Sequence, residues 1–286
     1  MSGAFRAILG ILLLANGLTS DRLAGSVQWH EVISGQSLTS IGARFGVESI
    51  TLAADNGLRT NARLTPGQRL MIDNRHIVPA VAVDGVVVNV PQRMLFVLRD
   101  GRVLSSFPVA VGRPSWPTPT GQFEIRVKET DPTWDVPASI QREMAAAGKQ
   151  VLCKVPPGPG NPLGTRWLGL SSSSIGIHGT NAPASIYHFT THGCIRLHQD
   201  DVARLFALVE VGTRVQLIYE PVLVARVSLQ EVMLEVHRDI YKRGGATTAD
   251  VSRALARAGA AGLVEDRDVE RILSGHWGRA MRLRLK

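Results

Sequence analysis

The chain has 286 residues, of which 44% are hydrophobic and 20% charged, with a formal net charge of +8. This length allows one large domain or two unequal ones, and the balance of residues excludes wholesale disorder. Basic residues are scattered apart from a C-terminal group, and no basic stripe is interleaved with aromatic residues. The composition therefore argues against nucleic acid as a partner.

The first 24 residues contain a short apolar run between charged and polar residues. Arg6 precedes the run at Ala7–Ala15, and Asn16, Thr19 and Ser20 follow it. This order is typical of a secretory signal peptide, whereas a membrane-spanning helix needs ~20 apolar residues. We predict that residues 1–24 form a signal peptide or an N-terminal anchor and that the protein is exported. A buried N-terminal helix is the alternative.

Residues 28–74 have the pattern of a small strand–helix–helix–strand unit. Apolar residues recur at helical spacing after the turn Ser34–Ser37, which can also cap a helix. The expected elements are a strand at His30–Ile33, a helix that Gly46 ends, a second helix that ends at Asn56–Gly57, and a strand at Arg69–Ile72. The runs HEVISGQSLTSIGARFGV, DNGL and LTPGQRLMI resemble a LysM domain, in the same order. This resemblance implies binding to glycans that contain N-acetylglucosamine.

A linker with Pro79 leads to a second region, residues 84–221, that is rich in strand signals. Expected strands lie at Val86–Val90, Met94–Leu98, Val103–Val111 and Gln122–Val127, and expected helices at Ser139–Ala147 and Gln199–Val209. Short strands between regular turn signals indicate a β-sandwich or barrel, so the fold class is mainly β, or α+β overall. Residues 222–286 are expected to form a helical C-terminal extension, with Leu229–Tyr241 helical or mixed and helices at Thr248–Ala258 and Asp266–Ser274.

The residues around Cys194 carry the most specific chemical signal. His178 and His192 lie close to this cysteine in the sequence, and a neighbouring base or cation lowers a thiol's pKa and favours the nucleophilic thiolate. Gly193 precedes the thiol, and its N–H together with that of Cys194 is expected to form an oxyanion hole for a tetrahedral acyl intermediate. These residue types suit acyl transfer through a thioester.

Two other interpretations use the same residues. Cys194 with His178, His192 and His198 has the ligand types of a zinc site, although the sequence lacks the CxxC or HExxH frame of such sites. The second alternative is a buried, inert cysteine among structural histidines.

The same segment resembles the active site of the L,D-transpeptidases, which have a YkuD-type catalytic domain. The resemblance lies in His178 followed by Thr191-His192-Gly193-Cys194, and in the flanking runs HGTNAP and CIRL. The runs VVVNVPQRMLFVL, TPTG and PPGPGNPLGTRWLGL also match, so the resemblance extends from about Val86 to Pro221.

This resemblance implies a cysteine L,D-transpeptidase of peptidoglycan biosynthesis that needs no metal or organic cofactor. Cys194 would attack the carbonyl between residue three and D-Ala four of a tetrapeptide stem, release D-Ala and pass the acyl group to an amine, which gives a 3-3 cross-link. His178 would be the base, with its ring held by a carbonyl such as that of Gly179, and His192 would shape the pocket and assist proton transfer. The implied substrate-binding residues are Gly179, Thr180, Thr191 and Arg196.

The acceptor is left open by the sequence. The run Val232–His237 resembles the segment that follows the catalytic domain in Gram-negative wall transpeptidases, including those that anchor an outer-membrane lipoprotein. An L,D-carboxypeptidase that uses water and a non-catalytic wall-binding protein are further alternatives. In each case the expected partner is peptidoglycan, the expected location is the periplasm or cell wall, and a carbapenem is expected to acylate an active Cys194.

The local sequence pattern gives expectations for four further residues. Cys153 is expected to be a packed strand residue outside any disulfide. Trp116 and Trp134 are candidates for lining the substrate cleft, and Trp167, which alternates with apolar residues, is expected in the core.

Overall fold

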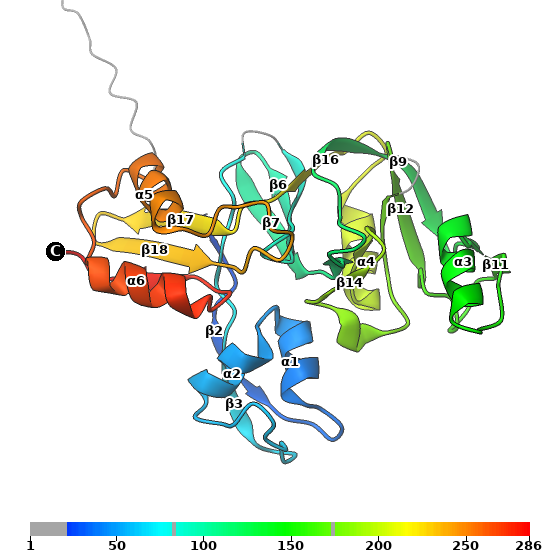
Figure 1. Cartoon of the computed structure of the whole chain (residues 1–286), viewed down its shortest axis with the longest axis horizontal. Coiled ribbons are helices and arrows are strands. Elements are labelled where there is room, and N and C mark those ends of the chain that lie inside the picture. The colour runs from blue at the N-terminus through cyan, green and yellow to red at the C-terminus, as the bar shows by residue number, and fades with distance from the viewer. Residues whose placement is uncertain (1–21, 82–83, 173–174) are drawn as a thin grey trace, which may run out of the picture.

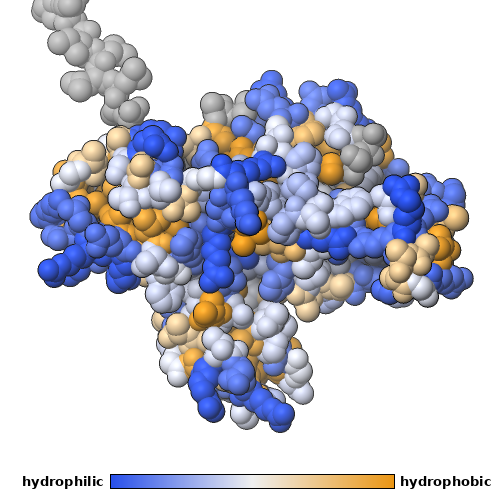
Figure 2. Space-filling view, viewed as in Figure 1, coloured by the Kyte–Doolittle hydropathy of each residue, from blue (hydrophilic) through white to orange (hydrophobic). Residues whose placement is uncertain are grey.

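The structure, a computed structural model, describes residues 22–81, 84–172 and 175–286 (Figure 1). The predicted signal peptide therefore lies outside the described residues except for its last three positions. Within the described ranges, no helix is long and apolar enough to cross a bilayer. The described chain forms a βααβ unit, a β domain and a C-terminal α/β unit (Figure 1). Most of the face in Figure 2 is hydrophilic, and apolar residues gather over the C-terminal unit.

The βααβ unit has the predicted order of elements: β2 (Val27–Glu31), α1 (Leu38–Phe45), α2 (Ser49–Asp55) and β3 (Arg69–Asp73). Ser37 caps α1 through a capping box with Ser40, and Gly46 ends the helix in the left-handed conformation at φ +72°. β2 pairs with β3 in antiparallel register. Apolar residues of both helices and of β3, including Ile41, Leu52 and Ile72, form the core of this unit.

The β domain is built on an eight-stranded mixed sheet of order β15-β13-β12-β9-β16-β5-β6-β7. In chain order these strands are β5 (Gly85–Asn89), β6 (Met94–Arg99), β7 (Arg102–Pro108), β9 (Gly121–Thr130), β12 (Arg166–Leu170), β13 (Gly176–His178), β15 (Ile195–Arg196) and β16 (Arg214–Ile218). The sheet closes on itself, because Ala110, just after β7, exchanges two backbone hydrogen bonds with Arg196 in β15, at 2.9 and 3.0 Å. Residues from both edges, such as Phe107 and Ile195, consequently share one core with α4 (Gln199–Leu208). The predicted mainly β, α+β class is confirmed.

Shorter elements surround this sheet. β8 (Val111–Gly112) pairs with β14 (Phe189–Thr191), and the 3-10 turn η2 (Pro183–Ser185) precedes β14. β10 (Trp134–Asp135) and β11 (Lys154–Val155) form a ribbon that carries α3 (Ala138–Ala146). β1 (Leu23–Ala24) pairs with β4 (His76–Ile77) beside the C-terminal unit.

The expectation of a helical C-terminal extension is wrong for its first part. Residues 222–236 form the strands β17 (Val222–Ser228) and β18 (Glu231–Val236), which β19 (Met281–Leu283) completes as a sheet. One face of this sheet packs on α5 (Thr248–Arg257) and α6 (Asp266–Gly275), and the other face packs on β4. Strands buried on both faces carry apolar runs, here Val222–Ala225 and Val232–Leu234, so their sequence lacks the alternation that separates a strand from a helix. The two helices lie where they were predicted.

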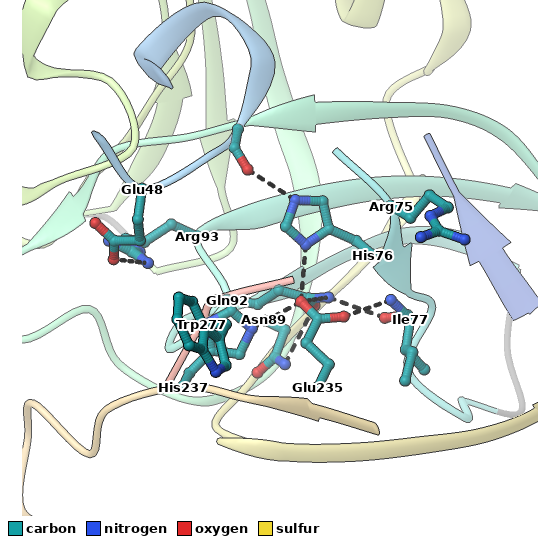
Figure 3. A network of polar contacts seen from close by, with 12 residues as sticks. Glu48, Arg75, His76, Ile77, Asn89, Gln92, Arg93, Glu235, His237 and Trp277 are labelled. Carbon is teal, nitrogen blue, oxygen red and sulfur yellow. Dashed lines mark hydrogen bonds and ion pairs between the residues drawn. The ribbon is translucent and has the colours of Figure 1, made fainter. Parts of the chain in front are cut away.

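A buried carboxylate joins the three parts of the molecule (Figure 3). Glu235 of β18 accepts hydrogen bonds at Oε1 from His76 Nδ1, His237 Nε2 and Gln92 Nε2, at 2.7, 2.8 and 3.0 Å, and at Oε2 from Ile77 N at 2.5 Å. The other nitrogen of His76 lies 2.8 Å from the carbonyl of Gly46, at the end of α1. The His76 ring thus bridges the Glu235 carboxylate and the carbonyl at the end of α1.

Two arginine residues of the neighbouring parts also hold the βααβ unit in place. Arg93 pairs with Glu48 at 2.7 Å while its guanidinium lies 4.2 Å from the ring centroid of Tyr187. Arg279, from the C-terminal unit, pairs with Asp55 at 2.7 Å and with Asp73 at 2.6 Å. The βααβ unit is therefore fixed by charged contacts to both of its neighbours.

Replacement of the central carboxylate is expected to destabilise the whole chain. Glu235→Gln replaces the buried carboxylate that pairs with His76 by a neutral amide, and removal of one partner of a buried pair costs about 3–5 kcal/mol. Urea unfolding followed by circular dichroism measures the change. The exposed Glu270→Gln on α6 is the matched control, and an equal small effect of both variants would contradict this role of Glu235.

The junction also predicts a loss of stability in acid. Burial alone would raise the pKa of Glu235, but His76 and His237 hold it at about 2, against 4.5 without these contacts. A lowered carboxyl pKa contributes stability above pH 4.5 that is lost towards pH 2, by about 3 kcal/mol, and the lowered pKa of the buried His237 acts in the same direction as pH falls. Unfolding free energy measured from pH 7 to pH 3 should fall, and the fall should be smaller in Glu235→Gln.

Candidate active site

Cys194, His178 and His192 line a common pocket of about 540 Å³. Its floor belongs to β12, β13 and the turn before β15, and its other wall comes from the β10–β11 ribbon and the first turn of α3. The wall residues from this second group include Trp134, Pro137, Ser139 and Ile140. Of this insertion, the sequence indicated only Trp134 as a residue that lines the cleft.

The turn that carries the thiol is held by two threonine hydroxyls. Thr191 Oγ1 donates to Cys194 O at 2.6 Å and accepts from Gly193 N at 3.1 Å. Thr118 Oγ1 donates to Gly193 O at 2.9 Å and accepts from Gly112 N at 2.8 Å. Gly193 has φ +104°, a conformation that L-residues with side chains rarely adopt, and a Cβ there would lie 3.1 Å from Ile175. These contacts define the backbone position of the nucleophile.

Strand register places the chemical groups on one face. β13 runs parallel to β15 with His178 opposite Arg196, and β12 runs antiparallel to β13 with Trp167 opposite His178. Cys194 lies two residues before Arg196, so its side chain points to the same side of the sheet. Closure of the sheet at Ala110 and Arg196 thus completes the pocket floor.

His178 is oriented as a base. Its Nδ1–H donates to the carbonyl of Gly179 at 2.7 Å, as predicted, and the ring lies 5.7 Å from that of Trp167. This bond leaves the lone pair on Nε2. Burial, with the nearby Arg196 cation, lowers the pKa of His178 to about 3, so the imidazole is neutral at physiological pH.

The thiol is also neutral in this arrangement. Burial raises the pKa of Cys194, while a hydrogen bond from the Gly176 backbone and the charge of Arg196 act in the opposite direction without cancelling it. The sequence predicted a thiol pKa lowered by neighbouring histidines. The structure corrects this prediction, because desolvation disfavours the charged form of both partners.

Comparison with known proteins supports what this geometry indicates. The family model of the L,D-transpeptidase catalytic domain, YkuD, matches residues 84–217, and that of the LysM domain matches residues 30–73. A Bacillus subtilis protein named as an L,D-transpeptidase, YkuD, is 34% identical over 186 residues, which is 65% of this chain and 96% of that protein. The chain belongs to the L,D-transpeptidase family. The sequence-based assignment to this family, with a LysM module, is confirmed.

One further curated relative and one solved structure are similar to part of this chain. An Escherichia coli K12 protein named as an L,D-transpeptidase, ErfK/SrfK, is 35% identical over 178 residues, covering 62% of this chain. This chain spans 57% of the length of that relative. A solved L,D-transpeptidase from Mycobacterium smegmatis aligns with 46% of this chain and 57% of that one, at 24% identity and a TM-score of 0.38.

Of the substrate-binding residues that the resemblance implies, only Arg196 lines the pocket. Its buried Nε has no hydrogen-bond partner among the described residues, and no described carboxylate pairs with it. Thr180 is buried and accepts at its carbonyl from Gln199 Nε2 at 2.9 Å, and a Cβ on Gly179 would lie 2.5 Å from Gln199 Oε1. Gln199, which no sequence signal identified, therefore supports the loop after β13.

The remaining predicted positions are placed as follows. Thr191 is fully buried and holds the thiol turn. The N–H of Gly193 donates to Thr191 Oγ1, so an oxyanion would have to replace that hydroxyl as its partner. Substrate contact by Thr191 and the oxyanion hole of Gly193 and Cys194 stay predictions.

The zinc alternative is not supported. His198 lies outside the pocket lining, and its Nε2 contacts the carbonyl of Ala43 at 3.2 Å. Among the residues that the structure describes, the one group with metal-ligand spacing is His76, Glu235 and His237 at the junction. The contacts of that group are accounted for by the ion pair described above.

Two predictions from local pattern need correction. Cys153 is exposed rather than packed, and it forms no disulfide with Cys194. Trp116 and Trp134 line the pocket, but so does Trp167, which was expected in the core. Trp167 is half-buried because its strand faces the pocket at this position.

Thiol alkylation tests the neutral resting state. Iodoacetamide is expected to react more slowly with Cys194 in a Cys153→Ser chain than with the exposed Cys153 in a Cys194→Ala chain at pH 7, because burial raises the pKa of Cys194. Arg196→Gln should slow the Cys194 reaction about tenfold further, since the lost cation favours the thiolate. Adduct formation is followed by intact-protein mass, and a faster reaction of Cys194 than of Cys153 would contradict the assignment.

Proposed function

We propose that the chain is an exported peptidoglycan L,D-transpeptidase that forms an acyl-enzyme on Cys194. The observation that carries this proposal is the single pocket lined by Cys194, His178 and Arg196, with the lone pair of His178 on Nε2. The LysM module, which matches residues 30–73, supports peptidoglycan as the substrate polymer.

The first half-reaction breaks the amide between residue three of the donor stem and D-Ala four. As the sulfur of Cys194 attacks the carbonyl carbon, its proton moves to Nε2 of His178, which avoids a free thiolate in a buried site. His178 then returns the proton to the departing amine, D-Ala leaves, and a thioester remains.

The second half-reaction reverses these roles. An acceptor amine attacks the thioester and gives a proton to His178, and the sulfur leaves and recovers that proton. The N–H groups of Gly193 and Cys194 are the proposed oxyanion donors, with Gly193 exchanging its Thr191 partner for the oxyanion.

Arg196 supports recognition of a charged stem. Its guanidinium lies in the pocket, no carboxylate of the described residues pairs with it, and guanidinium groups bind carboxylates with paired hydrogen bonds. We assign it to a carboxylate of the donor stem. The acceptor is proposed to be a stem amine, which gives a 3-3 cross-link.

Mass spectrometry of products from disaccharide-tetrapeptides tests the function. Dimers that have lost D-Ala are the expected result, whereas tripeptides alone would indicate water as acceptor and a lipoprotein–tripeptide adduct would indicate anchoring. Cys194→Ala should abolish turnover and leave peptidoglycan pull-down unchanged, because the LysM module is intact. Cys153→Ala is the matched thiol control and should keep full activity; cross-linking by Cys194→Ala would refute the catalytic assignment.

A further inference from the structure

The helix α3 is held over the pocket by very little apolar contact. None of its nine residues is buried. Ser139 and Ile140 in its first turn line the pocket, and Glu143 lies three residues after Ile140, on the same face of the helix. The Glu143 side chain therefore points from α3 towards the site.

Glu143 contacts two groups beside the nucleophile. Its Oε1 accepts from Arg113 Nη2 at 2.7 Å, and its Oε2 lies 2.5 Å from Nε2 of His192. The hydrogen bonds from Arg113 and His192 keep the pKa of Glu143 below its usual value, so the group is an ionised carboxylate that only accepts. The proton of the contact to His192 must then sit on Nε2.

Arg113 competes for the same nitrogen. Its Nη2 is 3.1 Å from Nε2 of His192, close enough to donate if that nitrogen carried a lone pair. Arg113 is itself fixed beside His192, because its backbone N–H donates to Thr191 O at 3.0 Å. The His192 ring packs edge-on against Trp116, with centroids 4.8 Å apart. The ring is therefore held in place, and the carboxylate of Glu143 decides which of its nitrogens is protonated.

We propose that Glu143 is a positioning residue that docks α3 over the pocket and holds the His192 proton on Nε2, leaving Nδ1 as the nitrogen that can accept a proton. This inference rests on the proposed function, since it assigns a task to His192 in acyl transfer. His192 lies on the pocket lining two residues before the nucleophile. When α3 is docked, Nδ1 of His192 offers a second acceptor, besides His178, for the proton that an incoming amine must lose.

Nitrogen NMR of the ring tests the tautomer without any substrate. In the full chain labelled with ¹⁵N-histidine, the His192 signals, assigned by comparison with His192→Gln, should show the proton on Nε2. Glu143→Ala removes the acceptor, so Arg113 should donate to Nε2 and the proton should move to Nδ1. Arg142→Ala, an exposed neighbour on α3, is the matched control and should keep the parent tautomer. An unchanged tautomer in Glu143→Ala would overturn the proposal.

Kinetics with the tetrapeptide substrate give the second readout. Glu143→Ala should lower kcat by about tenfold or more, as expected for loss of a placed proton acceptor, while Arg142→Ala leaves it unchanged. An effect of Glu143→Ala confined to KM would overturn the role of Glu143 in orienting His192. If the parent chain turns over no stem peptide, the proposed function fails, whereas the NMR result still decides the tautomer.

Discussion

The arrangement of the molecule depends on the buried carboxylate of Glu235. It accepts hydrogen bonds from His76 after the LysM module, from Gln92 of the β domain and from His237 just after β18 (Figure 3). The other nitrogen of the His76 ring contacts the carbonyl of Gly46 at the end of α1. A buried charge is stable only when its partners stay in place, so these three parts are held together as one body. The C-terminal unit, to which the sequence analysis assigned no functional residue, supplies this carboxylate. The LysM module therefore contacts both of its neighbours directly, through Gly46, Glu48 and Asp55.

The same balance of burial and charge governs the active site. Burial raises the pKa of Cys194 and lowers that of His178, so it increases the pKa difference that opposes proton transfer from the thiol to the imidazole. Arg196 lowers both pKa values, so its effects on the pKa difference between the two groups oppose each other. The cation is therefore better suited to holding a substrate carboxylate than to driving ionisation. Proton transfer coupled to carbon–sulfur bond formation fits a pair that is neutral at rest.

The sequence predicted most of the fold because its local signals agree. Ser37 and Gly46 delimit α1, the strands of the β domain lie between turn residues, and His178 and Cys194, singled out by their spacing, line one pocket. It failed at β17 and β18, whose two buried faces remove the alternation of a strand. It also failed for the thiol pKa and for Trp167, since both depend on what covers the site. Gln199, Arg113 and Glu143 were missed because their roles arise from contacts between distant segments.

The way in which α3 is held over the pocket differs from the way in which the pocket floor is held. A helix without buried residues cannot be held by the hydrophobic effect, so its position over the pocket rests on polar contacts and on the β10–β11 ribbon. Such contacts are weak when exposed, which makes α3 the part of the site most easily displaced by a substrate. The floor, in contrast, is fixed by the closed sheet and by the threonines of the thiol turn. The pocket therefore combines a floor that backbone and buried hydroxyl contacts fix with a wall that exposed polar contacts hold.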